Sequence, residues 1–189
     1  MTAWTLAILV GGRSERMGQD KASLAFRGEP LLPSLVARVD AAEVLLVARP
    51  GQDVAAPGAR VVEDHRPGHA AMGGVHAALC EARHPLVVIP CDLPLVNGAL
   101  LRWLAMGLAQ ADLVLPTHEV PQPLHAAYGP ACLPALEAAL DAGRLSLRRG
   151  WFDALRVTRP TVDDWGDLDD GSSFAGANTP AEWAALEAR

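Results

Sequence analysis

The sequence predicts an α/β fold in which a doubly wound, mostly parallel sheet carries helices on both faces. Short apolar runs alternate along the chain with segments whose apolar residues recur at helical spacing, which is typical of βαβ units. The strongest run, at residues 86–89, is unbroken, as expected for a parallel strand buried on both faces. The first run, at residues 4–10, leads directly into a glycine-rich basic loop, a common phosphate-binding arrangement in α/β proteins.

Each element is predicted from its apolar period and from the turn and cap residues beside it. Strands are expected at residues 4–10, 44–48, 60–63, 86–89, 112–116, 123–128 and 156–161. Helices are expected at residues 31–39, 75–82, 99–109, 130–142 and 147–155. A last helix should follow Thr179, because Thr179 and Glu182 form a T-x-x-E capping box and Pro180 takes the first helical position. Residues 65–74, rich in Pro, Gly and His, and the acidic residues 163–171 are expected to be loops.

The composition favours a cytoplasmic protein with a small-molecule ligand. Half of the 189 residues are hydrophobic, enough for one domain, residues 1–189, with a sizeable core. The formal net charge of −6 disfavours binding to nucleic acid or to an anionic membrane surface. No apolar run approaches the length of a membrane span, and the N-terminus lacks a signal-peptide layout. Cys80, Cys91 and Cys132 are odd in number and far apart, which indicates reduced thiols.

The loop after the first predicted strand reads LVGGRSERMGQDK over residues 9–21. It carries three glycines and three cations, namely Gly11, Gly12, Gly18, Arg13, Arg16 and Lys21. The spacing excludes a P-loop, because five residues separate Gly12 from Gly18. The adjacent glycines Gly11 and Gly12 also exclude the G-x-G-x-x-G dinucleotide fingerprint. A plain turn has no use for three cations, so a phosphate-binding loop is the favoured interpretation.

Two acidic residues are expected beside this loop. Ligands of open α/β sheets bind beyond the carboxyl ends of the strands, where Asp64, Asp92 and the stretch around Asn178 should lie. Asp92 stands between two prolines after the strongest strand and is well placed to hold Mg²⁺ against phosphate oxygens. An Asx turn that closes the strand is the alternative. Together with the basic loop, the metal interpretation is favoured.

Five motifs resemble, in order, those of the molybdenum cofactor guanylyltransferases within the nucleotidyltransferase superfamily. The opening loop is similar to the family's L-A-G-G-x-S-x-R-M-G-x-D-K signature, with Val10 in place of Ala. The remaining matches are Gly28-Glu29-Pro30-Leu31-Leu32 to G-x-P-L-L, Cys91-Asp92-Leu93-Pro94 to C-D-x-P, Gln122-Pro123-Leu124 to Q-P-L, and Asn178-Thr179-Pro180 to N-T-P. The resemblance covers nearly the whole chain.

This resemblance implies a Rossmann-like nucleotidyltransferase sheet and a specific reaction. The enzyme would transfer GMP from GTP to the phosphate of molybdopterin or molybdenum cofactor, releasing pyrophosphate, with Mg²⁺ as cofactor. Transient contacts with other cofactor-biosynthesis or acceptor enzymes would be expected. The implied site residues are Leu9, Val10, Gly11 and Gly12 for the nucleotide, Arg16 and Lys21 for the phosphates and catalysis, Asp64 for a further nucleotide contact, Asp92 for the metal and catalysis, and Asn178 for the acceptor or metal.

The chain also departs from the family pattern. It has Ala70-Ala71-Met72-Gly73-Gly74 where the family has G-P-L-x-G, Gly176 where N-x-N-T-P begins with Asn, and the apolar Val47 near an expected polar position. Related cytidylyltransferases tend to carry Ala-Ala-Gly at Val10-Gly11-Gly12, so Gly11 favours GTP over CTP. The alternatives are the cytidylyl reaction, another phosphorylated acceptor, or a non-catalytic carrier of nucleotide or cofactor.

Overall fold

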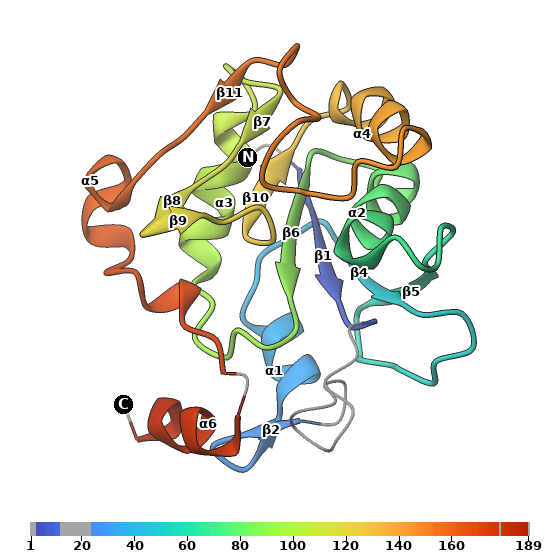
Figure 1. Ribbon diagram of the computed structural model, residues 1–189. Helices are drawn as coiled ribbons and strands as arrows, with labels where there is room; N and C mark the ends of the chain where they lie inside the picture. Colours follow the sequence, from blue (N-terminus) through green and yellow to red (C-terminus); the bar gives the residue numbers. More distant parts are fainter. Residues whose placement is uncertain (1–2, 12–23, 178, 189) are drawn as a thin grey trace.

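The computed structural model describes residues 3–11, 24–177 and 179–188. Its centre is a seven-stranded sheet with the strand order β11-β7-β10-β6-β1-β4-β5 (Figure 1). The strands are β1 Thr5–Leu9, β4 Glu43–Ala48, β5 Arg60–Glu63, β6 Leu86–Pro90, β7 Leu113–Val114, β10 Ala126–Tyr128 and β11 Val157–Thr158. Only β10 runs antiparallel to its neighbours β6 and β7, and the other pairs in this sheet are parallel. The predicted mostly parallel α/β sheet is therefore confirmed.

Two short ribbons accompany the main sheet. One pairs β2 Ala25–Phe26 with β3 Glu29–Pro30, and the other pairs β8 Thr117–His118 with β9 Val120–Pro121.

The central strands β1 and β6 bring the ends of several strands to one edge. Both are almost entirely buried, and apart from Thr5 they are apolar, as expected for parallel strands covered on two faces. Leu9 pairs with Pro90 of β6 and with Val47 of β4, so the carboxyl ends of the three strands are level with one another. In Figure 1 the arrowheads of β1 and β6 point to this same edge.

Helices cover both faces of the sheet (Figure 1). The helices of the described residues are α1 Leu31–Ala37, α2 Ala70–Glu81, α3 Gly98–Gly107, α4 Cys132–Asp141, α5 Val162–Trp165 and α6 Pro180–Glu187, the last of which lies beside β2. Because successive side chains of a strand point to opposite faces, Ile8 packs in one core cluster with α1 and α3, whereas Ala7 packs in the other with α2 and α4. The apolar faces of the sheet thus form two cores.

Helix α2 begins five residues before the predicted start, at Ala70 within the expected loop. Its paired glycines allow other segments of the chain to pack closely against the helix. A Cβ on Gly73 would lie 2.7 Å from the Arg66 carbonyl oxygen, and one on Gly74 would lie 3.3 Å from the Leu9 Cδ2 atom. The sequence places these glycines in the expected loop, because packing contacts of this kind leave no local signal.

Two other expectations are wrong. Residues 147–155 form turns instead of a helix, with the Trp151 indole donating to the Leu147 carbonyl and stacking near Tyr128. The acidic residues 163–171 contain most of α5 and a 3₁₀ helix at Gly166–Leu168 instead of a plain surface loop. Asp169 is buried there and accepts hydrogen bonds from the Gly171 amide and the Ser173 hydroxyl.

The predicted capping box of α6 is confirmed. The Glu182 amide donates to the Thr179 hydroxyl, and the Thr179 amide donates to the Glu182 carboxylate, both at 3.2 Å. Trp183 of this helix packs edge-on against Phe26, with ring centroids 5.6 Å apart, and its indole donates to the Ala25 carbonyl. The last helix is thereby attached to the β2–β3 ribbon. No helix in the described part of the chain has the length and apolar character to cross a bilayer.

Candidate active site

A cavity of about 980 Å³ lies at the carboxyl ends of β1, β4 and β6, and we call it the strand-end cavity. Its lining comes from segments that are far apart in the sequence. The lining residues are Leu9, Gly11, Val47, Ala48, Arg49, Pro50, Asp64, Pro67, Gly68, Ala70, Ala71, Gly74, Pro90, Cys91, Asp92 and Leu124. The fold therefore brings four predicted site residues, Leu9, Gly11, Asp64 and Asp92, to one cavity.

The end of β1 is held by backbone hydrogen bonds to both neighbouring strands. The Val10 amide donates to the Val47 carbonyl at 2.9 Å, and the Cys91 amide donates to the Leu9 carbonyl at 3.2 Å. Val10 is buried, and its own carbonyl accepts from the Gln52 side chain. Val10 does not line the cavity, in contrast to Leu9 and Gly11. Its backbone groups instead fix the geometry of the strand end.

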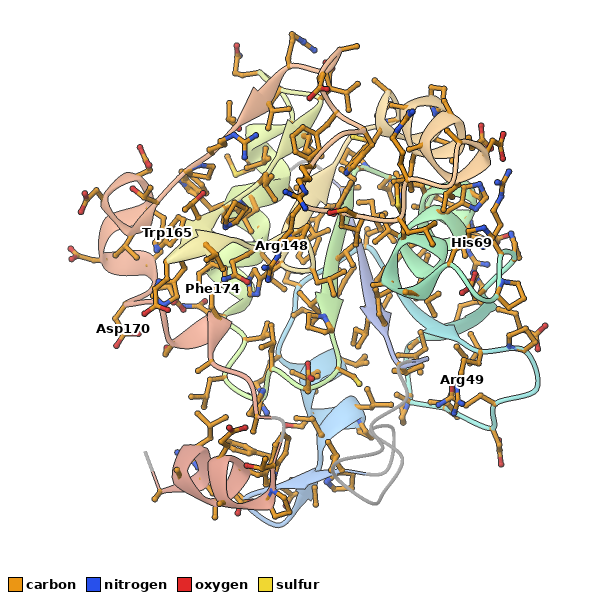
Figure 2. All side chains as sticks on the ribbon, in the orientation of Figure 1. Arg49, His69, Arg148, Trp165, Asp170 and Phe174 are labelled. Atoms are coloured by element: carbon orange, nitrogen blue, oxygen red, sulfur yellow. The ribbon has the colours of Figure 1, made fainter. Side chains whose placement is uncertain are left out.

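Gly11 lies close to the start of the loop after β4. A Cβ at this position would lie 3.1 Å from the Arg49 Cγ atom and 3.2 Å from the Arg49 backbone nitrogen. A glycine avoids this crowding and leaves the backbone accessible from the cavity. Arg49 directly follows β4 and is labelled in Figure 2.

Asp64 follows β5 and is fixed by its own loop. Its backbone amide donates to the Ala48 carbonyl at 2.8 Å, and its Oδ1 atom accepts from the Arg66 amide at 2.9 Å, as in an Asx turn. A Cβ on Gly73 would come within 2.9 Å of both carboxylate oxygens. Glycine at that point of α2 gives the Asp64 carboxylate its place at the cavity wall.

Asp92 follows β6 in a loop that two other segments support. The Arg38 guanidinium donates to the Pro94 carbonyl at 2.7 Å. A Cβ on Gly176 would lie 3.4 Å from the Asp92 carbonyl oxygen, so the chain leading to α6 runs against the same loop. Asp92 itself is half-buried and reaches the cavity.

A second cavity of about 570 Å³, which we call the side cavity, adjoins the first. The two share Ala70, Ala71, Pro90, Asp92 and Leu124. The rest of its wall is formed by Met72, Leu93, Gln122, Pro123, His125, Leu145, Ser146, Leu147, Arg148 and Phe174. Asp92 thus stands at the junction of two cavities, which is the arrangement needed to bring two ligands together at one carboxylate.

The side cavity contains an unusual buried histidine. His125 is 1% exposed, and neither ring nitrogen has a hydrogen-bond partner in the described part of the chain. Burial lowers the pKa of His125 to about 3, because the charged imidazolium would lose its hydration. The side chain is therefore a neutral imidazole at pH 7.

The chain matches the model of the MobA-like NTP transferase domain over residues 6–157. It belongs to the MobA-like NTP transferase family. Membership confirms the family-level prediction from the opening loop and the C-D-x-P motif, and it makes the protein a nucleotidyltransferase. The matched residues include both cavities except Phe174.

Relatives and a solved structure agree with this assignment. The chain is 32% identical to a probable molybdenum cofactor guanylyltransferase from Pelotomaculum thermopropionicum, over 94% of this chain and 89% of the relative. It is 35% identical to another from Deinococcus radiodurans, over 100% and 96%. The structure of molybdopterin-guanine dinucleotide biosynthesis protein A from Archaeoglobus fulgidus superimposes with a TM-score of 0.81 at 26% identity, covering 97% of each chain.

Several predicted site residues of this MobA-like NTP transferase lie outside the described residues. They are Gly12, Arg16, Lys21 and Asn178. Sequence reasoning missed others that line the side cavity. Single residues such as His125 and Phe174 carried no motif, and Arg148 fell within a predicted helix. Their grouping depends on a loop and a C-terminal segment that fold back onto the Q-P-L element.

The carboxylates of the strand-end cavity suit a metal bound together with a nucleotide. Among the described residues, no group of three or more His, Cys, Asp or Glu side chains could hold a metal. Asp64 and Asp92 each bring one carboxylate to the cavity. Mg²⁺ is usually bound by one or two carboxylates, water and substrate phosphates, so these oxygen donors fit Mg²⁺ better than a dedicated protein cage.

Proposed function

We propose that this MobA-like NTP transferase transfers GMP from GTP to the phosphate of molybdopterin or molybdenum cofactor and releases pyrophosphate. The observation that carries the proposal is the junction of two cavities at Asp92. The names of the relatives support the choice of guanine nucleotide and of acceptor. The strand-end cavity would hold GTP, and the acceptor would enter from the side cavity.

The glycine at position 11 supports a purine in the strand-end cavity. The space beside Arg49 is too tight for a Cβ, so a base edge would approach backbone groups near Leu9 and Gly11. Val47 offers only an apolar side chain to this wall. Asp64 would supply a further nucleotide contact, and Arg16 with Lys21 would hold the phosphates.

The reaction needs positioning more than proton transfer. The acceptor phosphate, with a second pKa of about 6, is largely dianionic at pH 7 and attacks without a general base. One of its oxygens forms a bond to the α-phosphorus of GTP, and the bond to the bridging oxygen breaks with its electron pair leaving on pyrophosphate. Asp92 would hold Mg²⁺, and the bound metal would neutralise part of the phosphate charge. Arg16 and Lys21 would stabilise the departing pyrophosphate, and Asn178 would approach the acceptor or metal.

The test is pyrophosphate release with molybdopterin, Mg²⁺ and GTP, CTP or ATP in turn. We expect GTP to give the fastest release. Asp92→Ala should lower turnover by a factor on the order of 10² to 10³, as expected when a principal electrostatic group is lost. Asp153→Ala is the matched control, because Asp153 is exposed and lines neither cavity.

Each alternative has its own outcome. Faster release with CTP would make the enzyme a cytidylyltransferase. Tight GTP binding without pyrophosphate release would indicate a carrier. Near-wild-type turnover of the Asp92 variant would refute the role of this carboxylate.

A further inference from the structure

His125 is the least expected residue of the side cavity. A buried imidazole with two unpaired nitrogens is unfavourable, and an aromatic or aliphatic side chain would fill the same space without that penalty. Because it is neutral, the ring offers one N–H donor and one nitrogen acceptor. The two groups point in different directions, so each can form one hydrogen bond to a polar ligand atom such as a ring nitrogen of a heterocycle. The unpaired groups therefore indicate a ligand that completes their hydrogen bonds.

An aromatic wall surrounds this imidazole. The Phe174 ring lies 4.4 Å from the His125 ring, and it stacks on His118 at 5.3 Å. Phe174 belongs to the 3₁₀ helix Ser172–Phe174, which is anchored where the Ser173 hydroxyl accepts from the Asn97 amide at 2.9 Å. A flat ligand ring in the place of Phe174 would meet the same two rings, those of His118 and His125.

Arg148 supplies positive charge to the wall of the side cavity. The loop after α4 contains Arg144, Arg148 and Arg149, all exposed, whose side chains make no hydrogen bond or ion pair with described residues. Only Arg148 of the three lines the side cavity. Figure 2 shows Arg148 and Phe174 at neighbouring places although they come from different segments. In a protein of net charge −6, an unpaired guanidinium at a cavity wall is suited to an anionic ligand group.

We propose that the side cavity selects the acceptor as a phosphorylated planar heterocycle, with Arg148 holding the phosphate and His125 hydrogen-bonding to the ring. This inference rests on the proposed function and adds residues outside the motifs that predicted it. His125 is 1% exposed and the Phe174 ring packs against it at a tilt of 43°, so the heterocycle would reach the imidazole by taking the place of that ring. Arg148 and Asp92 line the same cavity, which keeps the bound phosphate beside the nucleotide.

The first experiment measures binding without turnover. The probe is 6-hydroxymethylpterin monophosphate, followed by its fluorescence, with 6-hydroxymethylpterin and inorganic phosphate as competitors. Arg148→Gln and His125→Phe should each weaken probe binding at least 10-fold. Arg149→Gln, which removes the same charge from a residue outside the cavity, should change it less than 2-fold.

The competitors separate the two contacts. Arg148→Gln should abolish competition by inorganic phosphate, and His125→Phe should abolish competition by the unphosphorylated pterin. Equal binding of the probe to wild type, His125→Phe and Arg148→Gln would overturn the inference, as would a wild type that does not bind the probe. Thermal unfolding shows whether each variant is folded, and His125→Leu replaces His125→Phe if the latter is not.

Kinetics then distinguish recognition from a general structural role. Both variants should raise the KM for molybdopterin and leave the KM for GTP unchanged. An equal rise of both KM values would contradict the assignment of these residues to the acceptor. If the wild type releases no pyrophosphate but the probe still depends on Arg148 and His125, the proposed reaction fails and the heterocycle site stands.

Discussion

The buried imidazole of His125 couples the stability of the protein to pH. Its pKa falls from 6.5 to about 3 on folding, because burial disfavours the charged form. Between these two values, the unfolded chain binds a proton that the folded chain does not. The contribution of His125 to the free energy of unfolding therefore decreases as the pH falls below 6.5, by up to about 1.4 kcal/mol per pH unit.

We predict that His125→Phe removes this contribution. Urea unfolding of wild type and variant at pH 7, 6 and 5 should show a stability difference that grows in favour of the variant as the pH decreases. The comparison isolates His125, because the carboxylates and other histidines are the same in both proteins. At pH 7 the variant should be at least as stable as wild type, since two unpaired buried nitrogens are lost. A pH-independent difference would contradict the prediction.

At the scale of single residues, the sequence predicted the site residues that directly follow a strand. Asp64 and Asp92 each come directly after a strand, and parallel strands bring their ends to one edge. His125 and Arg148 have no such relation to a motif. Their neighbours, including Phe174, come from segments that approach only in the folded chain.

Helix α2 shows how an element can carry an unfavourable backbone conformation. Ala70 has a φ of +50°, in the left-handed region that favours glycine. The related signature has glycine at this position. Ala70 also lies where the two cavities meet, so its conformation shapes both walls.

We predict that Ala70→Gly stabilises the protein by about 0.5–1 kcal/mol, because glycine adopts positive φ without a Cβ clash. The matched control is Ala71→Gly, at the next residue of the same helix, where φ is not positive. It should destabilise by about 0.5–1 kcal/mol, the usual effect of glycine within a helix. Denaturant unfolding measures both. A destabilised Ala70→Gly variant would refute the prediction.

At the scale of elements, local signals were sufficient where a cap or a continuous apolar run marked the element. Helix α6 and strand β6 are of this kind. Helix α2 was predicted to start too late, because its glycines are required by close contacts with the preceding loop at Arg66 and with Leu9, which is distant in sequence. Residues 147–155 have the composition of a helix, yet Trp151 and Phe152 are fixed by packing into the core.

The whole molecule should be stabilised by its nucleotide. The strand-end cavity joins the carboxyl ends of three strands with the start of α2, so a ligand there contacts elements from both cores. A ligand that binds only the folded state, present at a hundredfold excess over its Kd, raises the free energy of unfolding by about 2.7 kcal/mol. For a chain of this size, that corresponds to a Tm increase of roughly 5–10 °C.

We predict that, at equal concentrations with Mg²⁺, GTP raises the Tm more than CTP or ATP. Differential scanning fluorimetry with each nucleotide measures the ranking, and Asp153→Ala serves as the control variant with an unchanged shift. Equal shifts for the three nucleotides would contradict selection of guanine by the wall around Gly11.

The sequence by itself determined the α/β class, the central strands, the last helix and the acidic residues at the strand ends. These follow from local patterns, since apolar runs, caps and strand-end positions are properties of neighbouring residues. Only the tertiary structure decided that Asp92 stands between two cavities and that His125 is buried without a hydrogen-bond partner among the described residues. Both facts arise from the approach of α2, the loop after α4 and the chain before α6, and such long-range packing leaves no periodic signal in the sequence.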